Sequence, residues 1–167
     1  MTIETIKCTD STQHPTTVGI ISDTHGLLRP EVITSFKGVD LILHAGDVGD
    51  PEVIDGLESI APLVAVRGNM DYGSWADQLP VSKSLCIAKT NLFLIHDLEW
   101  IERQFDLKRY QVIINGHTHR PLIEKQDNVL FFNPGSAGHQ RRGHAVSIGK
   151  LILCNGQPAA HLMELDV

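Results

Sequence analysis

Seven side chains that can bind a metal ion follow five short apolar segments of the sequence. Each apolar segment has the length of a buried β-strand, and a glycine stands beside most of the polar residues. In open α/β sheets, sites form in the crevice outside the carboxyl ends of the strands, so these side chains can converge there. The seven residues are Asp23, His25, Asp47, Asn69, His96, His117 and His119.

The donor atoms of this set are nitrogen and oxygen, without sulfur. Such ligands suit divalent ions such as Mn²⁺, Fe²⁺, Zn²⁺ or Ni²⁺. A single ion takes about four to six ligands, so seven ligands indicate two ions. Hydrolytic sites with two metals hold the ions about 3.5–4 Å apart, which requires a bridging anion. Asp47, which lies between the two halves of the set, is the predicted bridge.

The order of these motifs resembles the calcineurin-like metallophosphoesterase superfamily, and within it the branch of small, single-domain bacterial and archaeal phosphodiesterases. The resemblance rests on five motifs between residues 18 and 119, and a later segment extends it. The motifs are Asp23-x-His25, Gly46-Asp47, Gly68-Asn69, the lone His96 and Gly116-His117-x-His119, and the later segment is Asn133-Pro134-Gly135-Ser136.

The resemblance implies a metal-dependent phosphodiesterase that acts on a small phosphodiester, with Mn²⁺ as the expected metal. In the family, a hydroxide that bridges two metal ions would attack phosphorus in line with the leaving oxygen. The metals would also neutralise charge that develops on the phosphoryl oxygens. The family pattern assigns Asp23, His25, Asp47 and His119 to the first ion, and Asp47, Asn69, His96 and His117 to the second.

Two positions depart from the family pattern, although neither change removes a ligand. Met70 stands where the wider family often has a histidine that is proposed to protonate the leaving group or stabilise the transition state. Asp97 follows His96, where a glycine and a second histidine are common.

His44 resembles the histidine of the family's His-x-Gly-Asp segment. Three interpretations of His44 stay open: a group that orients the ligands, the missing acid, or a histidine satisfied at a strand end.

Other polar residues near the motifs have less specific predicted roles. Arg141 or Arg142 could contact a substrate phosphate, but a solvated basic turn or a subunit contact is the favoured interpretation. Asp50, Asp71 and Asp97 are expected to cap helices or turns and to accept hydrogen bonds around the site.

The elements that would carry these residues predict an α/β fold. Strands over 18–21, 40–43 and 63–66 alternate with two helices that each begin with a proline. This βαβαβ pattern is typical of a parallel sheet with crossover helices. The loop over 70–80 contains aromatic residues that could contact a substrate, although closure of the loop onto the core is favoured.

The second half of the chain predicts a β-hairpin, one further helix and then an all-β segment. We expect a hairpin over 84–95, a helix over 98–109, a strand over 112–114, and then only strands over 122–165, with turns at Asp127-Asn128 and Gly149-Lys150. Together the halves predict two facing β-sheets flanked by helices, an α-β-β-α sandwich. The strand-end residues of both halves could then meet at one edge of the sandwich.

Length and composition bound the class of protein. The 167 residues fit one domain, predicted over 17–167 after a loose N-terminal segment, 1–16. The formal charge of 14 − 20 = −6, with no basic cluster beyond the pair 141–142, argues against a surface that coats nucleic acid and against a nuclease. Three widely spaced cysteines disfavour disulfides and a thiolate zinc site. Because no apolar run resembles a signal peptide or a membrane span, we expect a soluble cytoplasmic protein.

A competing interpretation is a non-enzymatic metal-binding scaffold or protein-interaction module. The family includes such a protein, the retromer scaffold subunit, which is similar in size and fold and has lost part of the metal ligands. The full set of seven ligands in this sequence favours an enzyme instead. Small family members are often dimers or tetramers, so the resemblance also implies a homodimer or homotetramer.

Overall fold

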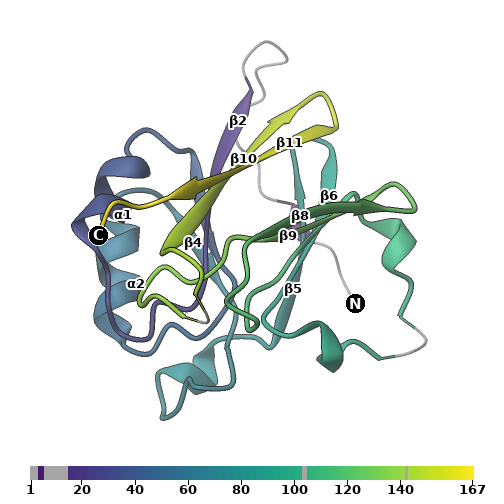
Figure 1. The fold of residues 1–167 in the computed structure, drawn as a ribbon. Helices are drawn as coiled ribbons and strands as arrows, with labels where there is room; N and C mark the ends of the chain where they lie inside the picture. Colours follow the sequence, from purple (N-terminus) through teal and green to yellow (C-terminus); the bar gives the residue numbers. More distant parts are fainter. Residues whose placement is uncertain (1–3, 6–14, 103–104, 142) are drawn as a thin grey trace.

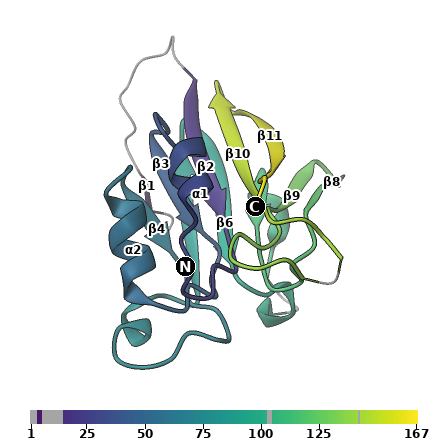
Figure 2. The same ribbon diagram turned by 60° about the vertical axis from the view of Figure 1, so that its left-hand side comes forward.

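The computed structural model describes residues 4–5, 15–102, 105–141 and 143–167 of the chain. Two mixed β-sheets pack face to face, and the two α-helices cover the outer face of one of them (Figure 1 and Figure 2). The predicted α/β sandwich is therefore confirmed. Within the described residues, no helix has the length and apolar character needed to cross a membrane.

The five-stranded sheet has the strand order β11-β10-β2-β3-β4. Strands β2, β3 and β4 are parallel, as the βαβαβ pattern predicts, and β10 pairs antiparallel with β2. Both crossover helices begin with a proline, and Asp50 caps the second by accepting a hydrogen bond from the Glu52 amide at 2.8 Å. The bounds are β2 Thr16–Ile21, α1 Pro30–Ser35, β3 Leu41–His44, α2 Pro51–Glu58, β4 Leu63–Ala65, β10 Ser147–Cys154 and β11 Gln157–Glu164.

The six-stranded sheet has the strand order β1-β5-β6-β7-β9-β8. The predicted hairpin of β5 and β6 is confirmed, and β6, β7 and β9 run parallel. A tight turn at Asp127-Asn128 joins β8 to β9, as predicted. The N-terminal segment contributes β1, which pairs in parallel with β5. The bounds are β1 Glu4–Thr5, β5 Ser82–Ile87, β6 Thr90–Ile95, β7 Val112–Ile114, β8 Leu122–Gln126 and β9 Val129–Asn133.

The predicted turn at Gly149-Lys150 is wrong, because β10 runs without interruption from Ser147 to Cys154. Gly149 serves the contact between the sheets. A Cβ atom at this position would overlap the ring of Phe132, a buried residue of β9 on the opposite sheet. The glycine therefore makes room for an aromatic ring in the core, and the chain reverses later, between β10 and β11.

The predicted helix over 98–109 is also wrong. The segment contains two 3₁₀ turns, η2 Leu98–Trp100 and η3 Leu107–Arg109. A third 3₁₀ turn, η1 Ala76–Gln78, lies earlier in the chain. Asp97 and Asp106 start the two turns separately, each accepting a hydrogen bond from the amide two residues later. Residues 103–104 lie outside the described residues. The apolar side chains of the segment still pack on the outer face of the six-stranded sheet, around Tyr110.

The main core lies between the two sheets and sets their relative position. It is built from fully buried aliphatic side chains such as Ile20 and Leu43 on one sheet, and Leu94 and Ile114 on the other. Each fully buried side chain of this size stabilises the fold by about 1.5–3 kcal/mol. Because these residues lie in β2, β3, β6 and β7, the same packing brings the carboxyl ends of those four strands together.

Candidate metal centre

The seven predicted ligands lie at the edge where strands of both sheets end. Asp23 and His25 follow β2, Asp47 follows β3, and Asn69 lies in the loop after β4. The three histidines of the other half follow β6 and β7. A cleft of about 330 Å³ opens here, and its lining includes five of the seven predicted ligands: His25, Asp47, Asn69, His117 and His119.

Four of these residues form a first cluster. Single donor atoms of Asp23, His25, Asp47 and His119 all lie within 4.8 Å of one another. His119 Nε2 is 3.3 Å from Asp23 Oδ1, and His25 Nε2 is 3.9 Å from Asp47 Oδ2. The rings of His25 and His119 stack with centroids 5.3 Å apart. Two carboxylates and two imidazoles thus face one small volume.

A second cluster adjoins the first and centres on the amide of Asn69. Its Oδ1 lies 3.0 Å from both His96 Nε2 and His117 Nδ1. His96 Nε2 is in turn 3.5 Å from Asp47 Oδ1. Asp47 therefore turns Oδ2 toward the first cluster and Oδ1 toward the second. This arrangement allows one carboxylate to be shared between two ions.

The backbone of these loops is unusual at the candidate ligands. Asp23, His25, Asp47, His117 and His119 all have positive φ, between 48° and 66°. This left-handed region is uncommon for residues other than glycine and costs about 1–2 kcal/mol per residue. The strain is held in place by hydrogen bonds between the loops, such as the Asp23 amide to the Gly46 carbonyl at 3.0 Å. The other five described non-glycine residues with positive φ lie in the turns of β-hairpins, so away from such turns the strained backbone occurs at the candidate ligands.

Hydrogen bonds around the clusters aim the donor atoms. Ser22 Oγ and the His117 amide both donate to Asp23 Oδ2, at 2.6 and 3.2 Å, which leaves Oδ1 to face His119. His96 Nδ1 donates to the Ala45 carbonyl at 2.8 Å, which leaves Nε2 to face the second cluster. Such partners fix the tautomer and orientation of metal-binding histidines.

Asp47 is held by its own contacts. The Met70 amide donates to Oδ1 at 2.7 Å. Burial acts to raise the pKa of Asp47, but the hydrogen bond and charge of His96 lower the pKa below its ordinary value. A Cβ atom at Gly68 would overlap both the amide and Oδ1 of Asp47, and one at Gly116 would overlap Ser22 and Asp23. The glycines noted beside the donors in the sequence are therefore needed for close approach of the loops.

The residues of the first cluster fit a divalent cation. Asp23 Oδ1 and His25 Nε2 are buried and have no hydrogen-bond partner among the described residues. Burial raises the pKa of Asp23 to about 7, against the lowering effects of the His96 charge and the Ser22 hydrogen bond. A buried carboxylate without a nearby cation is costly, and a bound divalent ion would remove that cost.

His44 is fully buried, and its contacts decide among the open interpretations. Nδ1 accepts a hydrogen bond from the Gly46 amide at 3.2 Å, so Nε2 carries the proton and donates to Thr24 Oγ1 at 2.9 Å. Thr24 Oγ1 donates onward to the Val48 carbonyl at 2.9 Å. Burial lowers the pKa of His44 to about 3. With both nitrogens engaged, the ring ties two ligand loops together and does not face the cleft.

Several supporting residues were not singled out as such from the sequence. Ser22 and Thr24 act as described above, and Asn133 Nδ2 donates to the Gly116 carbonyl at 2.8 Å. The signal for Asn133 was the Asn-Pro-Gly-Ser motif itself. Asp71, expected to accept hydrogen bonds, accepts them from the amides of Gly49 and Gly68 at 2.8 and 2.7 Å.

Two further residues line the cleft beside the candidate ligands. Met70 is half exposed there, at the position where the wider family often has histidine. Arg141 also lines the cleft, so its guanidinium lies near any group bound between the clusters. Arg141 is at the same time exposed and part of a turn in which its carbonyl accepts a hydrogen bond from the His144 amide at 2.9 Å, in line with the basic turn expected from the sequence. Arg142 lies outside the described residues.

The fold and the site together define a metallohydrolase-type domain, in which two facing sheets present nitrogen and oxygen ligands at one edge. The chain belongs to the calcineurin-like phosphoesterase superfamily, whose domain model matches residues 17–155.

Individual proteins support the same assignment. A probable metallophosphoesterase of Methanocaldococcus jannaschii is 39% identical over 132 residues, covering 71% of this chain and 67% of that protein. A protein of the same archaeon named as a phosphodiesterase is 30% identical over 137 residues, covering 71% of this chain and 82% of its own. The solved structure of vacuolar protein sorting 29 from Cryptosporidium parvum superposes with a TM-score of 0.72 over 92% of this chain and 99% of that one. At 17% identity, this last similarity shows the fold alone.

Proposed function

We propose that the protein is a metal-dependent phosphodiesterase that hydrolyses a small phosphodiester with two divalent ions. The observation that carries the proposal is the Asp47 carboxylate, whose two oxygens face two separate clusters of candidate ligands. A relative that matches over most of its length is named as a phosphodiesterase, which supports the diester as the substrate class.

The chain's own residues would hold and orient the ions. Asp23, His25 and His119 would bind the first ion and Asn69, His96 and His117 the second, with Asp47 shared between them. When bound, two such ions lower the pKa of a water molecule and neutralise charge that develops on the phosphoryl oxygens. We propose Mn²⁺ as the native metal, with Fe²⁺, Zn²⁺ and Ni²⁺ as alternatives suited to the same ligands.

Arg141 would position the substrate. It lines the same cleft as the candidate ligands, and a guanidinium can donate two parallel hydrogen bonds to a phosphoryl group. A diester carries one negative charge, which the two ions and the guanidinium would attract. Removal of Arg141 should therefore weaken substrate binding without removing the metals.

The test combines metal analysis with hydrolysis assays. Purified protein loaded with Mn²⁺ should contain two ions per chain and hydrolyse bis(4-nitrophenyl) phosphate faster than 4-nitrophenyl phosphate. Exhaustive chelation should abolish the activity, and Mn²⁺ should restore it. Activity that survives chelation would contradict the proposal. Stoichiometric metal without turnover of any diester or monoester would support the scaffold interpretation instead.

A further inference from the structure

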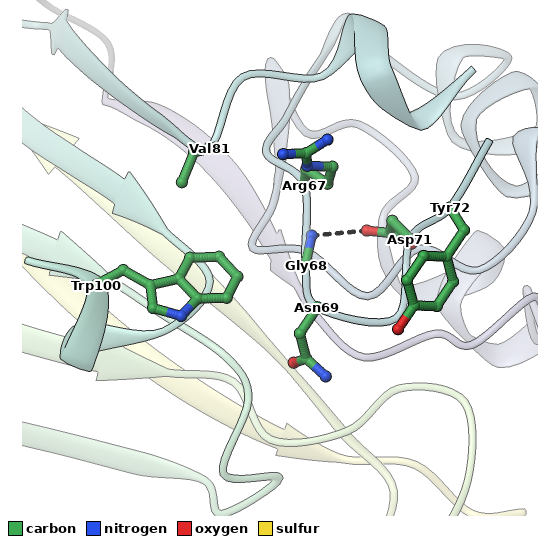
Figure 3. A pocket seen from close by; sticks show the side chains of 7 residues that line it. All are labelled: Arg67, Gly68, Asn69, Asp71, Tyr72, Val81 and Trp100. Atoms are coloured by element: carbon green, nitrogen blue, oxygen red, sulfur yellow. Dashed lines mark hydrogen bonds between the residues drawn. The ribbon is translucent and has the colours of Figure 1, made fainter. Parts of the chain in front are cut away.

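A second cavity of about 410 Å³ lies next to the metal centre and shares Asn69 with it. Figure 3 shows Trp100 on one side of the Gly68–Asn69 segment and Tyr72 on the other, with Val81 and Arg67 further along the wall. Its volume is within the range of about 300–1,000 Å³ that small-molecule sites occupy. A molecule bound at Asn69 in the cleft could therefore extend into this cavity.

The aromatic walls are anchored to elements of the metal centre. Trp100 lies in η2, and its ring is 5.7 Å from that of His96 at an angle of 50°. Tyr72 follows Asp71, whose carboxylate accepts hydrogen bonds from two glycine amides of the ligand loops. The Trp100 ring is thus held against a candidate ligand, and the backbone next to Tyr72 is held by the ligand loops.

Both rings are nevertheless open to solvent. Tyr72 is 69% exposed and Trp100 is 40% exposed, although most large apolar side chains of the described residues are buried. Of the aromatics in the loop over 70–80, Trp75 packs onto the core, as favoured from the sequence, and Tyr72 does not. Exposed aromatic rings beside a polar site are typical of surfaces that bind ligands.

The cavity also offers a polar edge. Arg67 Nη1 contacts Asp77 Oδ1 at 3.2 Å, which orients the guanidinium and uses one nitrogen of a group with five N–H donors. A ligand that matches these walls has a flat face for stacking and acceptor atoms on its rim. An alkyl group has neither a flat face nor acceptor atoms, and a phenyl group has only the flat face. A nucleobase has both.

We propose that this cavity binds the nucleobase of a nucleoside phosphodiester whose phosphate lies in the metal cleft. The inference rests on the proposed function, because Asn69 joins the two sites and the phosphate would be held by the metal centre. It names the substrate class that the family assignment leaves open. It also agrees with the acidic chain, since a small nucleotide does not need the extended basic surface that a nucleic acid needs.

The test compares a nucleotide with the sugar phosphate that lacks its base. Titration calorimetry with Mn²⁺-loaded protein would measure the affinity for adenosine 5′-monophosphate and for ribose 5-phosphate. We expect the nucleotide to bind about tenfold more tightly, a difference that corresponds to about 1.4 kcal/mol. In Trp100→Ala the two affinities should become nearly equal, whereas Trp100→Phe should keep most of the difference. Ile33→Ala, which removes an equally exposed apolar side chain from α1, should keep all of it.

Two results would overturn the proposal. One is equal affinity of the unmodified protein for both ligands, and the other is a difference that survives in both Trp100→Ala and Tyr72→Ala. The second variant keeps the test valid if Trp100→Ala does not fold. Failure of the proposed function looks different, because no phosphodiester would then be hydrolysed while the preference for the base persisted.

Discussion

His96 Nε2 lies 3.5 Å from Asp47 Oδ1, although the two residues follow strands of different sheets. The same carboxylate faces His25 through Oδ2. A single side chain thus connects the two ligand clusters and the two halves of the sandwich. The candidate site is complete only when the sheets are packed together, so metal binding and folding should be coupled.

The position of Asp47 between the clusters predicts that its loss reduces metal binding and activity more than the loss of a ligand that belongs to one cluster. We expect Asp47→Asn to lose both ions and to lower activity by more than about 100-fold, while Asn69→Ala loses one ion. Elemental analysis of each purified variant measures the ions per chain. Asp127→Asn is the matched control, because it makes the same change in an exposed turn that tolerates asparagine. The bridge is wrongly assigned if Asp47→Asn keeps both ions and Asn69→Ala loses both.

The buried Asp23 predicts a pH dependence of stability in the metal-free protein. Burial raises its pKa from 3.8 to about 7 in the folded state. Between these values the folded state binds the extra proton, so the contribution of Asp23 to stability falls as the pH rises from about 4 to about 7. Asp23→Asn, which mimics the protonated form, should therefore gain stability relative to the unmodified protein across this range, on the order of a few kcal/mol.

Urea denaturation in the presence of a chelator, at pH 4.5 and pH 7.5, measures this difference. Addition of Mn²⁺ at pH 7.5 should stabilise the unmodified protein more than Asp23→Asn, because the variant lacks a charged ligand of the first ion and keeps the ligands of the second. If the stability of the two proteins depends on pH in the same way, ionisation of Asp23 does not destabilise the folded state, and the expectation is wrong.

The place of Arg141 in the cleft predicts a role in substrate binding. A hydrogen bond to a charged group contributes about 1.5–3 kcal/mol, so Arg141→Ala should lower kcat/KM for a diester by about tenfold or more, mainly through KM. Arg141→Lys should recover only part of the loss, because an ammonium cannot donate two parallel bonds. The metal content should stay unchanged, and Lys125→Ala on the exposed strand β8 is the control. Unchanged kinetics in Arg141→Ala would place Arg141 outside the substrate site.

Met70 predicts a preference for good leaving groups. Among the described residues that line the cleft, those outside the ligand set are Met70 and Arg141, and neither donates a proton at neutral pH. A positioned general acid contributes about 10²–10⁴-fold to the rate, mostly for poor leaving groups such as alkoxides. We expect aryl diesters to be cleaved readily and alkyl diesters poorly. Met70→His should raise kcat/KM for an alkyl diester far more than for an aryl one.

The comparison of kcat/KM for one aryl and one alkyl diester in both proteins tests this expectation. Buried His44 is not a substitute donor, because both of its nitrogens are engaged with the ligand loops. Equal gains on the two substrates, or none on either, would mean that Met70 does not mark a missing acid.

The sequence by itself determined the features that depend on neighbouring residues. The alternation of apolar strands with proline-initiated helices predicted the parallel half of the sheet, and the Asp50 cap was readable from its position before Pro51. The polar residues after each strand were predicted to converge, because the carboxyl ends of packed strands share an edge. These inferences needed only local periodicity and spacing.

Tertiary packing decided what depends on residues distant in the sequence. The ring of Phe132 on the facing sheet explains why Gly149 lies within a strand, although a glycine followed by lysine suggested a turn. The contacts of His44 with Thr24 and Gly46 assigned it an orienting role that its motif left open. Trp100, at the end of η2, and Arg141, in a later turn, border the site because the packed sheets bring their segments to the same edge. Each outcome reflects which side chains the two sheets bring into contact, and that is set by the packed core as a whole.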